Sequence, residues 1–226
     1  MPRPPRSAES GMIYHVLNRA NGREKIFKKQ KDFEAFQDIL LEAKEKYPMR
    51  ILSFCLMPNH WHLVLRPHEG RDLSVFMRWV THTHTQRYNA HYGLIGRGHV
   101  YQSRYKSFPV NSDSYFLKVC RYVERNPLRA RLVKSVYDWK WSSFWIREDK
   151  NEKYKKLLSK WPVATLKNYR EWVNEAQVNE DEELERIRNS VNRNCPFGEN
   201  SWVRKISHKL GLESTLKPIG RPRKGT

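Results

Sequence analysis

Two short apolar runs, separated by little more than a turn, constrain the fold of this chain most strongly. Residues 50–56 and 60–65 are dominated by Leu, Ile, Val, Phe and Trp, and Pro58-Asn59 lies between them. Pro and Asn are typical turn residues. Each run has the length of one strand, and so short a connection joins strands that run antiparallel. The chain is therefore expected to contain an antiparallel sheet built around this pair.

Further strands and helices flank this pair in a fixed order. Alternating apolar residues indicate strands, and apolar residues three or four positions apart indicate helices. Asp72 is expected to cap the second helix, and Ser112 the third, which Pro127 ends or bends. The order predicts an α+β, ferredoxin-like βαββαβ fold, an antiparallel sheet with helices on one face plus one further helix. The expected strands cover 12–17, 50–56, 60–65 and 101–110, and the expected helices cover 29–47, 72–88 and 112–127.

The charge of the chain indicates what it binds. It has 43 Lys and Arg against 24 Asp and Glu, a net charge of +19. Such an excess is typical of a protein that binds a polyanion, most often nucleic acid. A ribosome-associated or generally basic protein is the alternative. We expect a basic leader over 1–10, the main domain over 11–148, a helical extension with an acidic stretch over 149–200, and a basic helix and tail over 201–226.

Cysteine usage and hydropathy indicate the compartment. Cys55, Cys120 and Cys195 are odd in number, so they cannot form a complete set of disulfides, and reduced, buried thiols are expected. No apolar run reaches the length of a membrane span, and the N-terminus lacks the apolar core of a signal peptide. We expect a soluble cytoplasmic protein with no membrane partner.

His60 and His62 lie in the second apolar run, two residues apart. Alternate residues of a strand face the same side, so both imidazoles can meet one divalent cation. Two histidines at the rim of a sheet, satisfied by neighbours or water, are the alternative. The apolar Leu63–Leu65 that follows favours burial, and buried imidazoles need partners.

Tyr122 and Asn126 lie four residues apart on the third helix, hence on one face of it. The phenol can act as a nucleophile towards a phosphodiester, and the amide oxygen as a third metal ligand. Tyr115, seven residues earlier, is the rival nucleophile, but Val119 four residues after it cannot bind a metal. We therefore prefer Tyr122, with an ordinary boundary tyrosine as the alternative.

Basic and aromatic side chains are candidates for contacts with nucleic acid. Unpaired bases can stack on aromatic rings, although core packing is the commoner role of such rings. The C-terminal Gly-Arg-Pro-Arg-Lys resembles an AT-hook core that enters the A·T minor groove, with simple phosphate contacts as the alternative. The candidates are Lys118, Arg121 and Arg125 for the DNA backbone, Trp61, Tyr101 and Tyr105 for bases, and Arg221, Arg223 and Lys224 in the tail.

Several of these motifs together resemble the HUH single-tyrosine transposases. His60-Trp61-His62 matches their His-hydrophobic-His signature. Residues 122–130, Tyr-x-x-x-Asn-Pro-Leu-Arg-Ala, are similar to the nucleophile helix of the REP-associated branch of that family. Tyr14–Arg19 and Trp139–Ser143 also resemble that branch. The resemblance covers about residues 11–145, and agreement among spaced motifs makes it specific.

The resemblance implies an enzyme that cuts and rejoins single-stranded DNA near small, REP-like hairpins. His60 and His62 would hold Mg²⁺ or Mn²⁺ with Asn126 as the third ligand. Tyr122 would attack the scissile phosphate and leave a covalent 5′-phosphotyrosine and a free 3′-hydroxyl. Insertion-sequence relatives more often have glutamine in place of Asn126, whose amide reaches less far. DNA binding would associate the protein with the nucleoid.

Two further functions are kept open. A replication or mobilisation initiator would use the same chemistry at an origin, but the chain has no helicase motif. A transposase-derived module would bind DNA without cutting it, and the retention of His60, His62, Tyr122 and Asn126 argues against such a loss of activity. The resemblance leaves open whether strands are exchanged within a monomer or between the subunits of a homodimer.

Overall fold

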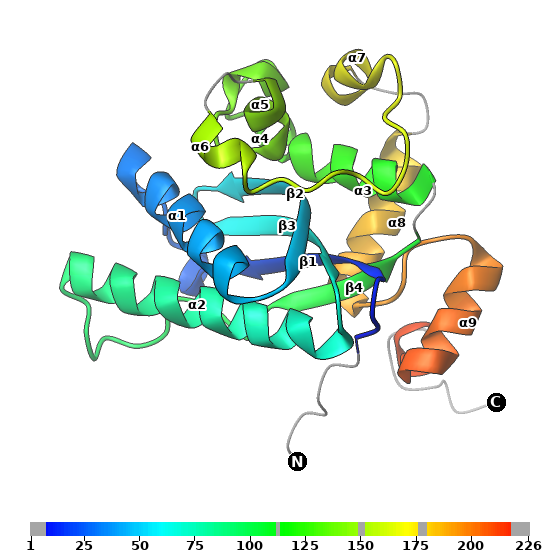
Figure 1. The fold of residues 1–226 in the computed structure, drawn as a ribbon, viewed down its shortest axis with the longest axis horizontal. Coiled ribbons are helices and arrows are strands. Elements are labelled where there is room, and N and C mark those ends of the chain that lie inside the picture. Colours follow the sequence, from blue (N-terminus) through cyan, green and yellow to red (C-terminus); the bar gives the residue numbers. More distant parts are fainter. Residues whose placement is uncertain (1–7, 112–113, 149–151, 176–179, 218–226) are drawn as a thin grey trace, which may run out of the picture.

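The computed structural model describes residues 8–111, 114–148, 152–175 and 180–217. Four strands form one sheet in the order β2-β3-β1-β4, and every neighbouring pair in it is antiparallel (Figure 1). The turn at Pro58-Asn59 joins the two strands that the sequence placed side by side. The strands are β1 Ile13–Arg19, β2 Met49–Met57, β3 His60–Pro67 and β4 Lys106–Val110.

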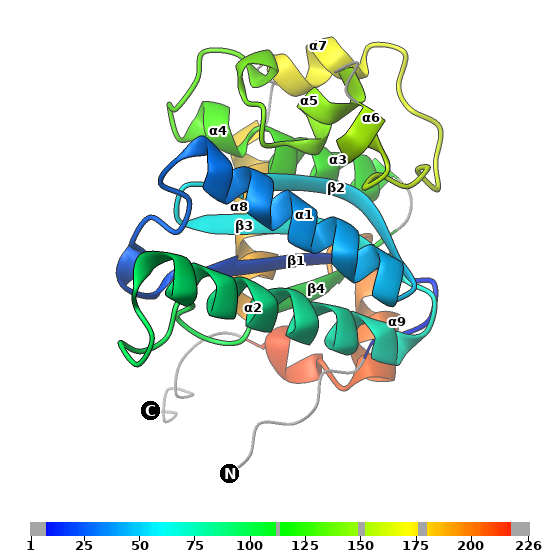
Figure 2. The ribbon, with the colours of Figure 1, turned by 60° about the vertical axis from the view of Figure 1, so that its left-hand side comes forward.

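Two long helices complete the βαββαβ order and cover one face of the sheet. Helix α1 (Gln30–Lys46) connects β1 to β2, and helix α2 (Gly70–Tyr92) connects β3 to β4. Figure 2 shows both helices lying in front of the sheet. Their apolar sides bury Phe36, Leu40 and Phe76 against alternate residues of the strands. This confirms the predicted α+β architecture.

Two predicted boundaries were wrong. Asp72 is not the cap of α2, because the helix begins earlier and the Asp72 carboxylate accepts a hydrogen bond from the backbone N–H of Glu69, the capping residue, at 2.7 Å. Strand β4 starts at Lys106 rather than Tyr101. Residues 100–102 do follow the end of β1, through hydrogen bonds such as Gln102 N–H to Arg19 C=O at 3.0 Å, but the chain then turns away before it rejoins the sheet.

Trp61 lies between the two candidate metal-binding histidines in sequence but faces the opposite side of the sheet. Its ring is fully buried, so it is not available to stack on a base. Its indole N–H donates to the Tyr101 hydroxyl at 3.0 Å. That hydroxyl lies 2.7 Å from Nδ1 of buried His84, to which it donates in turn. The three side chains fix the loop before β4 to the core of the sheet.

The buried His84 predicts an acid-sensitive fold. Burial lowers the pKa of His84 to about 3. The unfolded chain, with a His pKa near 6.5, therefore binds more protons below pH 6.5, and the free energy of unfolding falls as the pH drops. We expect His84 to account for about 2 kcal/mol of lost stability between pH 7 and pH 5. Urea unfolding of His84→Asn, which keeps an acceptor for Tyr101, should show a shallower pH dependence; an unchanged slope would contradict this origin.

Helix α3 (Ser114–Glu124) covers the other face of the sheet, and a short helix, α4 (Asn126–Arg129), follows it. The predicted apolar stripe of α3 is confirmed, since Phe116, Val119 and Val123 are buried against β2, β3 and β4. Ser112, expected to cap this helix, lies outside the described residues. The sheet is therefore covered on both faces, and α3 presents Tyr122 to the same side of β3 as His60 and His62.

Residues 169–175 and 180–193 pack beside α3 (Figure 1), whereas Tyr154 lies against α1, where its hydroxyl donates to Asp38 at 3.2 Å. Tyr169, Val173 and Ile187 are buried in the apolar cluster beneath α3. The described helices after α4 are α5 Ser143–Glu148, α6 Glu152–Lys155, α7 Tyr169–Asn174, α8 Glu180–Arg193 and α9 Asn200–Leu210. The described residues also form three 3-10 turns, at Asn21–Arg23, Val136–Asp138 and Glu213–Thr215.

A buried carboxylate holds α3 in place. Glu124, at 1% exposure, accepts hydrogen bonds from the hydroxyls of Ser53 at 3.2 Å and Ser143 at 2.5 Å. It also accepts one from the Tyr169 hydroxyl at 2.8 Å and pairs with Arg147 at 3.2 Å. These donors satisfy a carboxyl group that would be costly to bury without hydrogen-bond partners. These contacts tie α3 to β2, α5 and α7, and so fix the position of Tyr122.

The three cysteines are free and buried, as predicted. Across the part of the chain that the structure describes, no helix combines the length and the apolar composition needed to cross a membrane.

Candidate active site

The structure brings His60, His62 and Tyr122 together. The imidazole centroids of His60 and His62 lie 5.0 Å apart on β3. The ring of Tyr122 on α3 meets the His62 ring edge-on, at a centroid distance of 5.7 Å. His60 and His62 share a side because they are two residues apart on a strand, and α3 packs across that side. The expected juxtaposition of two imidazoles and one phenol is therefore present.

His60 is held with one ring nitrogen free for a cation. Its Nδ1 lies 2.6 Å from Oδ1 of Asn59. The Asn59 amide nitrogen donates to the Arg23 carbonyl at 3.1 Å, which fixes the amide so that its oxygen faces the imidazole. Nδ1 of His60 must then carry the proton, and Nε2 has the lone pair. Burial, with the charge of Arg19, lowers the pKa of His60 to about 4, so the imidazole is neutral at pH 7.

His62 forms a buried hydrogen bond with a third histidine. Its Nδ1 lies 2.9 Å from Nε2 of His15 on the neighbouring strand β1. Burial lowers the pKa of His15 to about 3 and holds the pKa of His62 well below its ordinary value. Both rings are therefore neutral, and one must donate to the other. The sequence placed His15 only on a strand near the site, without a role.

The direction of this hydrogen bond decides whether His62 can bind a metal. His62 presents a lone pair at Nε2 only if its Nδ1–H donates to His15. The proton of His15 then lies on Nδ1, which is buried without a hydrogen-bond partner among the described residues. The opposite tautomer leaves Nδ1 of His15 as an unpaired acceptor. Histidine ligands commonly use the other nitrogen in such a bond, which fixes their tautomer.

His15 is accordingly expected to control metal affinity through His62. His15→Phe removes the acceptor for Nδ1–H of His62, and we expect Mn²⁺ affinity to fall by about 10-fold. His15→Gln places an amide oxygen near the position of Nε2 and should keep most of the affinity. Calorimetric titration with Mn²⁺ measures both. Equal affinities for wild type and His15→Phe would remove His15 from the site.

Tyr122 lies at the border of the apolar stripe, as predicted, in a strongly basic environment. The guanidinium carbon of Arg129 lies 4.5 Å from the centre of the Tyr122 ring. Burial raises the pKa of the Tyr122 phenol, while Arg129, Arg188 and Arg19 lower it. The phenol is thus protonated at neutral pH, and the charges of the arginines favour its phenolate form.

Those three arginines were not among the residues expected to bind DNA. Arg129 lies two helical turns after Tyr122, a spacing that places both on one side of a helix. Arg19 is paired with His60 across the sheet, at the end of β1. Arg188 comes from α8, and no pattern in the sequence connects α8 with α3. A phosphate between Tyr122 and the histidines would be surrounded by these cations.

Asn126 has a structural role that its sequence position explains. Pro127 has no N–H, so the carbonyl of Val123 lacks its usual helical donor. The side-chain nitrogen of Asn126 donates to that carbonyl at 3.3 Å and to the carbonyl of Tyr122 at 3.1 Å. Its Oδ1 is left as an acceptor. The amide is therefore compatible with a ligand role, which remains a prediction.

The donor set fits a divalent cation in part. Neutral imidazoles with Nε2 lone pairs bind divalent transition metals, whereas Mg²⁺ and Mn²⁺ favour oxygen ligands such as an amide or a phosphate. In the described parts of the chain, no three His, Cys, Asp or Glu side chains converge as a metal site. The Asn126 amide oxygen, expected as the third ligand, is a donor of another type, and its ligand role stays a prediction.

The basic side of α3 is placed differently from the expectation. Arg121 and Arg125 are 4% and 6% exposed. Their guanidinium groups donate to backbone carbonyls of residues 172–175 at 2.7–2.8 Å. Lys118 pairs with Glu183 of α8 at 2.7 Å. This placement argues against phosphate contacts by Arg121 and Arg125, because the C-terminal half covers the side of α3 that the helical pattern left to solvent.

Of the remaining candidates, Tyr115 lies away from this site. The ring of Tyr115, the rival nucleophile, packs edge-on against Phe197 at 5.4 Å. It thus contacts the C-terminal half rather than the histidines. Arg221, Arg223 and Lys224 of the tail lie outside the described residues.

Comparisons with known proteins identify relatives of this chain. A family described as "Transposase IS200 like" matches residues 8–126, just over half of the chain. A REP-associated tyrosine transposase of Escherichia coli K12 is 22% identical over 136 residues, which cover 60% of this chain and 78% of that protein. A relative from Haemophilus influenzae is 23% identical over 117 residues, covering 48% of this chain and 66% of that protein.

A solved structure shares the fold. It is a REP-associated tyrosine transposase bound to a REP hairpin, and it superimposes with a TM-score of 0.54 at 19% sequence identity. The match covers 79% of this chain and 99% of that one, and so extends into the C-terminal half.

Proposed function

The chain belongs to the IS200-like transposase family and resembles its REP-associated tyrosine transposases, and we propose that it cuts and rejoins single-stranded DNA near small hairpins. Tyr122 is the nucleophile of this proposal. The observation that carries it is the edge-on contact of Tyr122 with His62, at 5.7 Å between ring centroids, inside a cluster of arginines.

The proposed reaction exchanges one phosphoester bond for another. The Tyr122 oxygen attacks the scissile phosphorus, the bond to the 3′-oxygen breaks, and the products are a 5′-phosphotyrosine and a 3′-hydroxyl. The phenol loses its proton and the leaving oxygen gains one. Because the ester is conserved, a 3′-hydroxyl can reverse the step and join a new strand without ATP. Arg129, Arg19 and Arg188 stabilise the negative charge of the phosphate and of the phenolate.

His60 Nε2, His62 Nε2 and Asn126 Oδ1 are the proposed ligands of Mn²⁺ or Mg²⁺. A cation held there would supply Lewis acidity at the scissile phosphate. The protein's own contribution is to keep both imidazoles neutral and oriented, through Asn59 for His60 and His15 for His62.

The net charge of the chain and its similarity to a transposase bound to a REP hairpin support DNA as the partner. A net charge of +19 favours binding to a polyanion whose affinity falls steeply with salt. The structural relative described above is bound to a REP hairpin, and a hairpin flanked by unpaired nucleotides is the corresponding substrate class here. Binding of this kind would keep the protein at the nucleoid.

Covalent capture tests the proposal. Wild-type protein is incubated with Mn²⁺ and single strands that carry the inverted repeats flanking its gene, and the mixture is resolved on a denaturing gel. We expect a protein–DNA adduct that EDTA prevents and that fully duplex DNA does not give. Adducts on origin-like DNA alone would favour the nickase alternative. Binding without any adduct would favour the non-catalytic module.

A further inference from the structure

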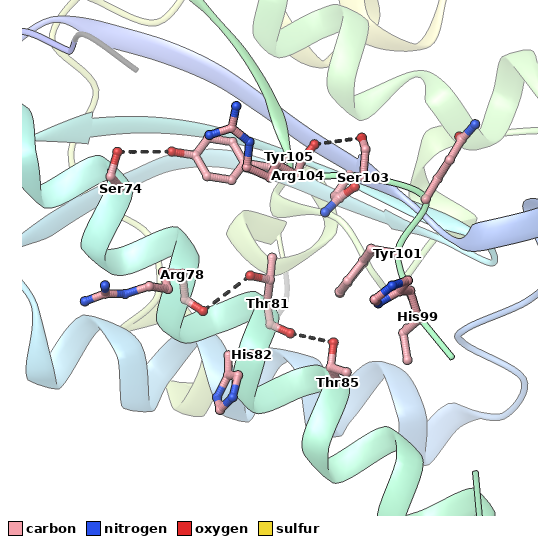
Figure 3. A pocket seen from close by; sticks show the side chains of 13 residues that line it. Ser74, Arg78, Thr81, His82, Thr85, His99, Tyr101, Ser103, Arg104 and Tyr105 are labelled. Atoms are coloured by element: carbon pink, nitrogen blue, oxygen red, sulfur yellow. Dashed lines mark hydrogen bonds between the residues drawn. The ribbon is translucent and has the colours of Figure 1, made fainter. Parts of the chain in front are cut away.

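A large open cavity lies on the face of the sheet opposite the candidate active site. It has a volume of about 750 Å³ and separates α2 from the segment that precedes β4. Figure 3 shows Ser74, Thr81 and Thr85 of α2 on one side and Tyr101, Ser103 and Tyr105 on the other. The mechanism proposed above uses none of these residues. A cavity of this size is in the range of small-ligand sites.

The aromatic walls of the cavity are held rigidly. Tyr101 is fixed through its hydroxyl by Trp61 and His84, as described above. The hydroxyl of Tyr105 lies 3.4 Å from that of Ser74, across the cavity (Figure 3). Both tyrosines are largely buried, at 9% and 7% exposure. Planar walls that need no ordering on binding suit a planar ligand, because little side-chain entropy is lost.

The charge of the cavity suits an anion. Arg78 and Arg104 line it and are exposed. None of its described lining residues is acidic, and neither guanidinium forms an ion pair within the described parts of the chain. Hydroxyls and the amides of Asn18 and Gln102 add neutral hydrogen-bonding groups. A planar ring joined to a phosphate, which is a nucleotide, meets both the aromatic and the cationic features.

The cavity and the candidate active site lie back to back at one end of β1. Asn18 lines the cavity, whereas the next residue, Arg19, points to the other face, where its charge acts on His60 and Tyr122. Consecutive residues of a strand face opposite sides, so the two sites are separated only by the thickness of the sheet. The segment from Val100 to Gln102, hydrogen-bonded to β1, forms the edge between them.

We propose that this cavity binds unpaired nucleotides of the DNA that flanks the hairpin, with bases against Tyr101 and Tyr105 and phosphates on Arg78 and Arg104. The proposal rests on the proposed function for the identity of the nucleic acid. A strand held in the cavity continues past the edge at Val100–Gln102 towards Tyr122. The cavity thereby selects and positions the unpaired strand without taking part in the chemistry.

Binding measurements test the proposal without cleavage. Fluorescence anisotropy gives the Kd of a blunt DNA hairpin and of the same hairpin with a short unpaired tail, in EDTA. The ratio of the two isolates the contribution of the tail. We expect Arg78→Ala and Arg104→Ala each to reduce that ratio by about 5-fold and to lower the salt slope for the tailed hairpin by about 0.7, one phosphate contact each. An abasic tail should reduce the ratio for the wild type.

The matched control is Arg50→Ala, an exposed arginine on β2 at the opposite edge of the sheet. It removes the same charge and should leave the ratio unchanged. A second measurement uses 4-thiothymidine in the tail, with the photo-crosslinked peptide identified by mass spectrometry. Crosslinks in residues 99–105 or on α2 support the proposal. Crosslinks confined to the α3 side, or an equal loss of the ratio in Arg50→Ala, would overturn it.

The two proposals fail separately. A wild-type protein that forms no adduct but shows an intact tail contribution, sensitive to Arg78→Ala, would refute the cleavage chemistry and retain the nucleotide cavity. An adduct that forms normally, with no tail contribution, would refute the cavity alone.

Discussion

Tyr122→Phe is expected to abolish the covalent protein–DNA adduct while leaving the affinity for hairpin DNA within about 2-fold of the wild type. The substitution removes only the hydroxyl, so the ring keeps its contacts with His62 and Arg129. Without the hydroxyl no phosphotyrosine bond can form, because the nucleophile is lost rather than weakened. Adduct is measured on denaturing gels with labelled hairpin strands, and affinity by anisotropy.

Tyr115→Phe is the matched control for this experiment. It makes the same chemical change seven residues earlier on α3, at a tyrosine whose ring packs on Phe197. We expect adduct formation to be unaffected. An adduct that survives in Tyr122→Phe and disappears in Tyr115→Phe would move the nucleophile to the rival tyrosine.

His60→Ala is expected to have the second largest effect, a loss of more than about 100-fold in the rate of adduct formation at a fixed Mn²⁺ concentration. Its Nε2 is the ring nitrogen that the hydrogen bond to Asn59 leaves free. His60 is less buried than His62 and does not hold Tyr122, so its removal separates metal binding from packing. Part of the rate should return at higher Mn²⁺, since the remaining ligands still bind weakly.

Calorimetry and thermal unfolding complete the test of His60. Mn²⁺ affinity should fall in His60→Ala, whereas His208→Ala should match the wild type, because the His208 side chain is 89% exposed. The melting temperature shows whether the fold survives. A folded His60→Ala protein with unchanged Mn²⁺ affinity would remove His60 from the metal site.

Local periodicity was enough to predict the central strands of the sheet and the side of it to which His60, His62 and Tyr122 point. The pairing of β2 with β3 followed from two apolar runs and a two-residue turn. The orientation of His60 and His62 followed from the alternation of a strand, and that of Tyr122 from the apolar stripe of α3. Each of these features depends on spacing within one element or between neighbours in sequence, where geometry is fixed by the backbone.

Contacts between distant segments could not be predicted in this way. The pattern on α3 left Arg121 and Arg125 on a solvated side, but carbonyls of residues 172–175, about fifty positions later, bury them. Arg188 reaches Tyr122 from α8 for the same reason. The bond of His15 to His62 needs the register of β1 against β3, which the sequence does not specify.

The starts of α2 and β4 were predicted wrongly because they depend on individual side-chain hydrogen bonds rather than on periodicity. Asp72 was expected to cap α2 because aspartate favours that position, yet it lies three residues after the N-cap, where its carboxylate accepts from the backbone N–H of Glu69 as the reciprocal half of a capping box. Tyrosine is common in strands, so Tyr101 was expected to begin one. Its hydroxyl is instead hydrogen-bonded to Trp61 and His84, and the chain at this point forms a wall of the cavity.

Tyr122, placed beside the two imidazoles of β3, is the residue that we expect to become joined to DNA. The most direct test is to trap the adduct with Mn²⁺ and hairpin DNA, digest it with nuclease and protease, and sequence the nucleotide-bearing peptide by mass spectrometry. We expect a nucleotide joined through its 5′-phosphate to the Tyr122 oxygen. A nucleotide attached to Tyr115 or to any other residue would contradict it.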